Sequence, residues 1–198
     1  MASGTLDRRT AARAAQQTEV LIYPSAWLSR TLTYPSTMLS LTALLHARND
    51  ALRLGRCLET VYPCDEIVVI DHGSTDRTLR IARDYGAKII GVAPETEGSS
   101  DLKQLVSTEW VICLDPRESL SEALAARLFE WKWNQAVGAD EKAYALLLRE
   151  ENEQGWIEDP VPQTRVVPAN WDRWNGRFPA NQRALPVLEG KLLRFAFP

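Results

Sequence analysis

The chain has 198 residues, of which 45% are hydrophobic and 25% are charged, values typical of a single globular domain. Its net charge is -3 and it contains no long Lys/Arg run, so we exclude nucleic acid as an electrostatically attracted partner. No apolar stretch approaches the roughly 20 residues of a membrane-spanning helix, so we expect a soluble protein, and peripheral contact with a membrane stays open.

The three cysteines, Cys57, Cys64 and Cys113, are odd in number and fit no zinc-binding spacing. Cys57 and Cys113 lie in apolar stretches, where a thiol usually packs as a small hydrophobic group. We therefore expect free, buried thiols and a reducing, cytoplasmic compartment.

Residues 1–36 differ from the rest of the chain. Their first half is rich in Ala, Arg, Gln and Thr, which predicts a frayed helix or no fixed structure. We expect an accessory tail at 1–36, followed by one domain over residues 37–198. Met38 immediately precedes the first convincing strand, so translation starting there is a further hypothesis, which the mass of the natural protein would test.

A regular pattern of elements begins at residue 39. Residues 39–45 form an apolar run, which predicts a strand covered on both faces. Asn49 and Asp50 are typical capping residues for a helix over 51–60. Residues 66–71 are rich in β-branched side chains and predict a second strand.

Strands and helices continue to alternate further along the chain. The pattern predicts strands at 87–92 and 110–115, a polar loop at 94–100, and helices at 75–85, 101–106 and from Ser119 or Ser121 to 134. Beyond Gly138 it weakens: 143–148 and 165–167 predict strands, and 188–197 predict a strand or a short helix. This alternation is typical of an α/β fold with a mostly parallel sheet and helices on both faces.

Three of the predicted strands end in polar clusters, at residues 46–50, 71–76 and 115–118. Taken singly, each cluster is more often a helix cap and a turn than a binding site. In open α/β sheets, however, ligands bind beyond the carboxyl ends of the strands, and three such clusters at one edge favour a site.

Three segments carry a specific resemblance: Ala47–Asp50, Asp65–Thr78 and Thr108–Asp115. Together they resemble family-2 glycosyltransferases, with a nucleotide-diphospho-sugar transferase fold, nearest the small transferases of the lipopolysaccharide-core type. The likeness extends from Met38 to the end of the chain, and the turn at 71–76 is its most specific element. It implies a donor nucleotide half at 37–118 and an acceptor half at 119–198.

The resemblance also implies which residues contact the nucleotide. Asp50 and Asp71 would accept hydrogen bonds from a base nitrogen and from ribose hydroxyls, and Asp76 would cap the following helix. The full set of positions implied to bind the nucleotide is Ala47, Arg48, Asp50, Asp71, Gly73, Asp115 and Arg117.

A divalent cation, Mg²⁺ or Mn²⁺, is implied by an Asp-x-Asp motif that begins at Asp115. Arg117 stands where the second acid is expected, which leaves Asp115 and Glu118 as candidate ligands and should weaken metal binding. Two alternatives stay open. Either the metal site is lost and Arg117 forms a salt bridge, or its guanidinium pairs directly with the diphosphate.

The acceptor side of the resemblance departs further from the family. An inverting transferase needs a base to deprotonate the acceptor hydroxyl, but residues 174–180 lack the expected His-Glu pair, and Arg194 stands where a late His is common. The remaining base candidates are Asp159 and Asp172, together with Glu158. Each is individually more typical of a solvated loop carboxylate.

The leading hypothesis is an inverting transferase that moves a sugar from a nucleotide-sugar donor to a cell-envelope glycan or lipid-linked acceptor. The alternative is a degenerate, non-catalytic relative that serves as a binding or interaction module, which Arg117 and the absent His-Glu pair favour. A nucleotide-binding protein of unrelated chemistry is a third hypothesis, which the absence of a glycine-rich turn after Leu45 disfavours.

Overall fold

The computed structural model describes residues 38–93, 102–134 and 143–198. The elements within these ranges belong to one compact unit, Pro35–Pro198. The tail predicted at 1–36 and the polar loop predicted at 94–100 lie outside the described residues.

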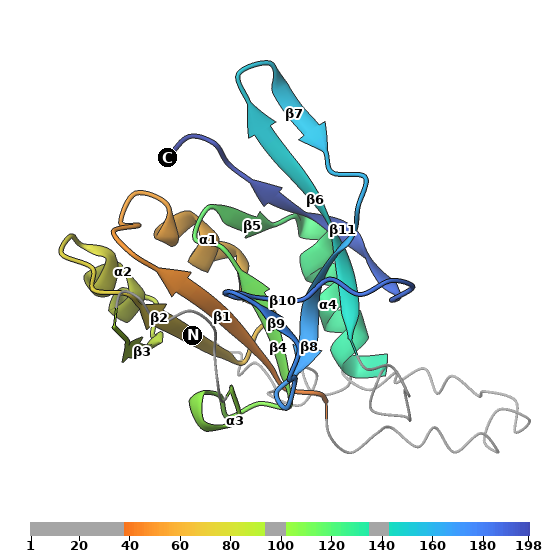
Figure 1. Ribbon diagram of the computed structural model, residues 1–198, viewed down its shortest axis with the longest axis horizontal. Helices are drawn as coiled ribbons and strands as arrows, with labels where there is room; N and C mark the ends of the chain where they lie inside the picture. Colours follow the sequence, from red (N-terminus) through yellow and green to blue (C-terminus); the bar gives the residue numbers. More distant parts are fainter. Residues whose placement is uncertain (1–37, 94–101, 135–142) are drawn as a thin grey trace, which may run out of the picture. The chain divides into compact units, whose positions relative to one another are not determined.

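Nine strands of the described chain form one sheet, in the order β3-β2-β1-β4-β8-β6-β11-β5, with β7 paired to β6 (Figure 1). Their bounds are β1 Leu41–Ala47, β2 Glu66–Asp71, β3 Lys88–Gly91, β4 Trp110–Leu114, β5 Glu118–Leu120, β6 Tyr144–Asn152, β7 Gly155–Glu158, β8 Gln163–Pro168 and β11 Val187–Arg194. A separate hairpin joins β9, Trp174–Asn175, to β10, Phe178–Pro179.

The sheet is mixed, because the strands of its two halves pair in different directions. The β3-β2-β1-β4 half is parallel, as predicted from the repeated strand-helix pattern. Beyond β4, strands β8, β7 and β5 run antiparallel to their neighbours, and only β6 and β11 pair in parallel. The α/β class is therefore confirmed, and the predominance of parallel pairing holds only for the first half.

The helices are α1 Leu54–Thr60, α2 Thr78–Asp84, α3 Leu102–Leu105 and α4 Glu122–Asn134. Each begins within three residues of its predicted start, and Ser121 caps α4 by accepting a hydrogen bond from Leu124 N. The predicted side-chain caps of α1 were wrong: Asn49 and Asp50 make no such bond and instead bind the backbone of the polar turns. Residues 188–197, for which strand and helix were both open, form β11 and an irregular end.

Side chains alternate between two apolar cores because successive residues of a strand point to opposite faces. Leu41, Leu45 and their alternating neighbours on β1 pack with α1, α2 and α4 in the larger core. Leu44 faces the second core, which Leu105 of α3 and Phe178 of the hairpin help to cover. Helices thus cover both faces, as expected.

Strand direction decides which polar residues share an edge of the sheet. The carboxyl ends of β1, β2 and β4 meet at one edge, which we call the donor edge after the donor nucleotide half that the sequence resemblance implies. Because β8 is antiparallel to β4, Gln163 at its start lies toward this edge and Pro168 at its end pairs with Trp110 at the opposite one. None of the helices among the described residues is long and apolar enough to cross a membrane.

Candidate functional site

The polar turns after β1 and β2 are joined by hydrogen bonds. Asn49 N donates to Ser74 Oγ at 3.0 Å, and Thr75 N donates to Asn49 Oδ1 at 2.8 Å. Asn49 adopts a left-handed conformation, with φ of 57°, which Asn tolerates better than most residues. The two turns therefore form one rigid element, as expected for clusters that share an edge.

The same connection continues into the first turn of α2. Asp50 N donates to Thr78 Oγ1 at 2.7 Å, and Ala51 N donates to Asp76 Oδ2 at 3.2 Å. Asp76 also accepts from Thr78 N at 2.9 Å, which is the capping role that the resemblance implied for it. Asp76 is thus occupied by structural bonds within the turn.

Asp71 and Asp50 are the carboxylates predicted to face a nucleoside. Asp71 is 6% exposed and accepts hydrogen bonds from Gly73 N and Ser74 N at 3.1 Å, which hold its side chain in place. Asp50 accepts from Arg48 N at 2.8 Å. Burial raises the pKa of Asp50, and the charge of Asp115, which follows the neighbouring strand β4, adds to this.

Two histidines lie between these turns, one at the end of each strand. His46 Nδ1 and His72 Nε2 are 2.9 Å apart, at hydrogen-bond distance, and both side chains are buried. Burial, the His72 ring and the charge of Arg177 lower the pKa of His46 to about 4. The pair is therefore neutral at pH 7, and one ring donates to the other.

Arg177, from the second half of the chain, acts electrostatically on both histidines. It is the second residue of the two-residue turn of the β9-β10 hairpin, after Gly176, whose φ of 60° suits the first central position of such a turn. Its charge also lowers the pKa of His72, after the larger effect of burial, and Arg48 adds to this. Two guanidinium groups from opposite halves of the chain thus act on the same pair of histidines.

Asp115, the first acid of the expected metal motif, is bound to the arginine that follows it. Arg117 Nε donates to Asp115 Oδ1 at 3.0 Å and Nη2 donates to Oδ2 at 3.3 Å. Burial raises the pKa of Asp115, but the hydrogen bonds and charge of Arg117 outweigh it, so the pKa lies below its usual value. The carboxylate is therefore ionised and paired.

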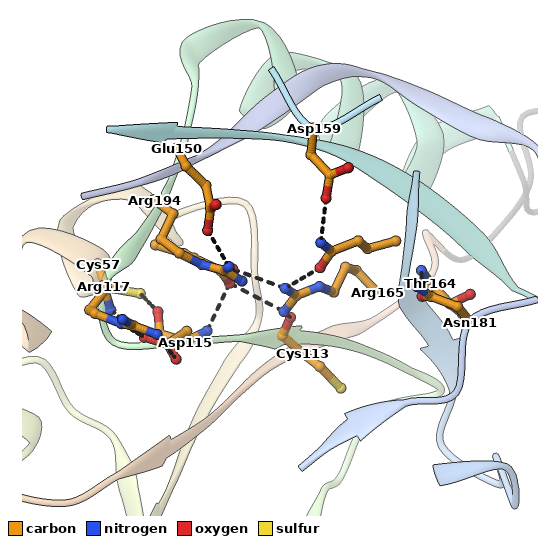
Figure 2. Close-up of polar contacts among 12 residues, drawn as sticks. Cys57, Cys113, Asp115, Arg117, Glu150, Asp159, Thr164, Arg165, Asn181 and Arg194 are labelled. Carbon is orange, nitrogen blue, oxygen red and sulfur yellow. Dashed lines mark hydrogen bonds and ion pairs between the residues drawn. The ribbon is translucent and has the colours of Figure 1, made fainter. Parts of the chain in front are cut away.

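Glu118, the other candidate metal ligand, is fully buried at the start of β5. Arg165 Nη2 donates to its Oε1 at 2.9 Å and Arg194 Nη2 donates to the same oxygen at 2.7 Å. Its Oε2 accepts from Asp115 N at 2.8 Å and from Arg165 Nη1 at 3.2 Å. Figure 2 shows the side chains of Arg165 and Arg194 pointing toward one another, and Glu150, which also accepts from Arg194, on a neighbouring strand.

These residues do not fit a divalent cation. Both acids of the motif already carry guanidinium partners, whereas Mg²⁺ and Mn²⁺ need several free oxygen ligands. Within the described ranges, no group of three His, Cys, Asp or Glu side chains could hold a metal ion.

The structure separates the predicted base candidates. Asp159 lies toward the donor edge, where it accepts a hydrogen bond from Gln163 Nε2 at 3.0 Å, and Gln163 in turn accepts from Arg165 (Figure 2). Asp172 follows the other end of β8 and lines a cavity of about 440 Å³ with Trp110 and Trp171. The fold therefore does not bring Asp172 to the donor edge.

Glu158, the third base candidate, pairs with Arg149 and Lys191 on the β6-β7 side of the sheet.

Sequence reasoning did not identify the partners of Glu118. Arg165 lies 47 residues away and Arg194 lies 76 residues away, so no local motif links them. The sequence did contain one indication, because Arg165 lies inside a strand with apolar residues. A charged residue is almost never fully buried without a partner. The histidine pair was also missed, although both histidines stand at strand ends.

No family model matches the chain. The curated relatives include 4,4'-diaponeurosporenoate glycosyltransferases of Staphylococcus aureus strains USA300 and NCTC 8325 / PS 47, each 40% identical to this chain over 63 residues. The match covers 30% of this chain and 16% of each relative, so the chain spans about one-sixth of their length.

Solved structures give fainter likenesses. Mannosyl-3-phosphoglycerate synthase from Rubrobacter xylanophilus matches with a TM-score of 0.45 and 19% identity, over 58% of this chain and 42% of the synthase. Glucosyl-3-phosphoglycerate synthase from Mycobacterium tuberculosis, in complex with Mn²⁺, UDP and glucosyl-3-phosphoglycerate, matches with a TM-score of 0.40 and 19% identity, over 57% and 43%. TM-scores at this level are too low to decide the fold or function of this chain.

The 63-residue sequence match does not rest on these structures. It confirms the resemblance to glycosyltransferases that we noted in the sequence.

Proposed function

We propose that this chain binds a nucleotide-sugar donor at the donor edge and transfers the sugar, with inversion, to a cell-envelope glycan or lipid-linked acceptor. One observation carries the proposal: Asp50, Asp71 and Asp115 stand at the carboxyl ends of three adjacent parallel strands, and hydrogen bonds join the turns of the first two. The 40% identical segment shared with glycosyltransferases supports the same assignment.

Asp50 and Asp71 are assigned to the nucleoside. Each carboxylate oxygen can accept two hydrogen bonds, so the bonds from the turn fix these groups and still leave capacity for a base N–H or a ribose hydroxyl. Ala47, Arg48 and Gly73 flank them and would line the same pocket.

Asp159 is the base candidate that the fold supports better. It stands on the acceptor half but toward the donor edge, whereas Asp172 lies at the opposite edge. An inverting displacement needs a carboxylate or imidazole within reach of the acceptor hydroxyl, on the far side from the leaving diphosphate. Because Asp159 stands toward the donor edge, we assign this role to it.

The competing function is a non-catalytic nucleotide-binding or interaction module. The observation that favours it is the pairing of both motif acids with arginines, which leaves no ready metal site among the described residues. This alternative predicts donor binding or partner binding without turnover.

A binding and transfer experiment separates the two. The full chain is titrated calorimetrically with UDP and a panel of UDP-, GDP- and dTDP-sugars, and labelled donor is then incubated with envelope lipids and glycans. Binding at micromolar concentration with labelled product supports the transferase. Binding without product supports the module, provided that the affinity for the nucleotide is unchanged in Asp159→Asn. Failure to bind any nucleotide contradicts the donor-site proposal.

A further inference from the structure

We propose that Arg117 takes the place of a divalent cation at this site, so that the donor diphosphate is held by a guanidinium group that Asp115 positions. The inference rests on the proposed donor site and specifies how it works. It predicts a site that binds nucleotide diphosphates without metal.

The geometry of the Asp115–Arg117 pair is the first observation. The carboxylate accepts from Nε at 3.0 Å and from Nη2 at 3.3 Å, and its Oδ1 also accepts from Arg117 N at 2.9 Å. These bonds use two of the five side-chain N–H donors of arginine and leave three for a ligand. The Arg117 side chain is 45% exposed and that of Asp115 is 23% exposed, so the cationic group is the more accessible of the two.

The hydrogen bonds and the burial of Glu118 are the second observation. Its two oxygens accept five hydrogen bonds, three at Oε1 from Arg165 and Arg194 and two at Oε2 from Arg165 and Asp115 N. The side chain has no exposed surface. A metal ion could reach Glu118 only by displacing buried guanidinium groups, which would leave uncompensated charges in the interior.

The chemistry of the diphosphate is the third argument. A planar guanidinium donates paired hydrogen bonds to phosphate oxygens and carries its charge at every pH at which the protein folds. Arg194 is adjacent to a residue that contacts Arg117, since Phe195 N donates to Arg117 O at 3.0 Å, and 21% of the Arg194 side chain is exposed. Arg194 is paired with Glu118 and Glu150, so Arg117 is the guanidinium that we assign to the diphosphate.

The test compares wild type with three variants. UDP affinity is measured by calorimetry in Mn²⁺ and in EDTA, and Mn²⁺ binding to the protein alone is measured from the electron paramagnetic resonance signal of the free ion. Arg117→Gln removes the charge, and Arg117→Asp rebuilds a pair of acids at 115 and 117. Arg173→Gln, at the opposite edge of the sheet, is the matched control for losing an exposed arginine.

We expect wild type to bind UDP equally in Mn²⁺ and EDTA and to leave the free Mn²⁺ signal unchanged. Arg117→Gln should lose about tenfold or more in UDP affinity, because a charge-assisted contact is lost, and Arg173→Gln should match wild type. Arg117→Asp should gain Mn²⁺ binding, and its UDP binding should require the ion.

Other patterns overturn the inference in distinguishable ways. UDP binding by wild type that needs Mn²⁺ would refute it and leave the donor site standing. Unchanged UDP affinity in Arg117→Gln would do the same. If wild type bound no UDP in either buffer, the proposed donor site itself would fail, and this inference with it.

Discussion

Asp71 and Asp76 lie five residues apart in one turn and accept similar backbone hydrogen bonds, yet we assign them different tasks. Asp71 is 6% exposed at the donor edge, while the carboxylate of Asp76 is committed to Ala51 N and to both donors of Thr78. The distinction between a binding residue and a capping residue is therefore testable within a single turn.

Asp71→Asn should lower UDP affinity about tenfold or more and change the free energy of unfolding by less than about 1 kcal/mol, because the amide oxygen still accepts the turn N–H groups. Asp76→Asn should do the reverse: it should cost about 1 kcal/mol of stability through the weakened cap and leave UDP affinity unchanged. Calorimetry and urea denaturation of the two variants check this. Equal loss of UDP affinity in both would show that the turn acts only as a scaffold.

The buried histidine pair makes stability depend on pH. In the unfolded chain His46 titrates near 6.5, whereas in the folded protein its pKa is about 4. Between these values the unfolded state binds the proton and the folded state does not, so stability is full above about pH 6.5 and falls as the pH decreases. From the shift in the pKa of His46 alone, the expected loss at pH 5 is about 2 kcal/mol.

Urea denaturation at pH 7.5 and pH 5 measures this loss. In His46→Asn, whose amide can occupy the position of Nδ1 beside His72, the loss should be clearly smaller. Some dependence should remain, because the pKa of His72 is also lowered. An identical pH dependence in wild type and variant would remove His46 as its source.

At the scale of elements, the register of β11 against β6 shifts between Val187 and Lys191. Gly190 adopts φ of 98°, and a Cβ added there would lie 2.4 Å from Leu124 N, in the first turn of α4. The close approach of strand and helix therefore depends on the missing side chain, and backbone rather than a flexible side chain blocks any substituent.

Gly190→Ala should destabilise the protein by about 3 kcal/mol or more, since it combines a left-handed backbone with a clash against α4. Gly86→Ala is the matched control: Gly86 also has positive φ, of 72°, but a Cβ there meets nothing within 4 Å. Its expected cost is about 1–2 kcal/mol. Thermal unfolding of both variants measures the two losses of stability. Equal losses would contradict a clash between residue 190 and α4.

At the scale of the whole molecule, Glu118 joins strands that are distant in the sequence. Its partners are Arg165 on β8 and Arg194 on β11, and Arg194 also pairs with Glu150 on β6 (Figure 2). This buried charge cluster ties the turn that carries Asp115 and Arg117 to the antiparallel half of the sheet.

Glu118→Gln should lower the free energy of unfolding by about 3 kcal/mol or more, because the two arginines would lose a fully buried counter-charge. Glu130→Gln is the matched control, since Glu130 pairs with Arg127 on the exposed side of α4 and should matter by less than about 0.5 kcal/mol. The urea midpoints of the two variants give the comparison. If Glu118→Gln does not fold, Arg194→Met tests the same cluster with the Glu118–Arg165 pair retained.

The sequence by itself determined the parallel half of the fold. Strands at 41–47, 66–71 and 110–114 are predictable because their runs of apolar residues, β-branched above all at 66–71, are local, and the polar turns after them follow from local turn chemistry. Parallel strands bring their carboxyl ends to one edge, so the grouping of Asp50, Asp71 and Asp115 could also be foreseen.

Only the tertiary structure decided the rest. The antiparallel direction of β8 decides that Asp159, before the strand, lies toward the donor edge and that Asp172, after it, does not, and that direction depends on long-range pairing with β4 and β6. Likewise, Glu118 looks like a metal ligand in sequence and is a buried partner of Arg165 in the fold. The identity of a charged group's partner is set by strands far apart in the chain, and no local pattern of residues encodes it.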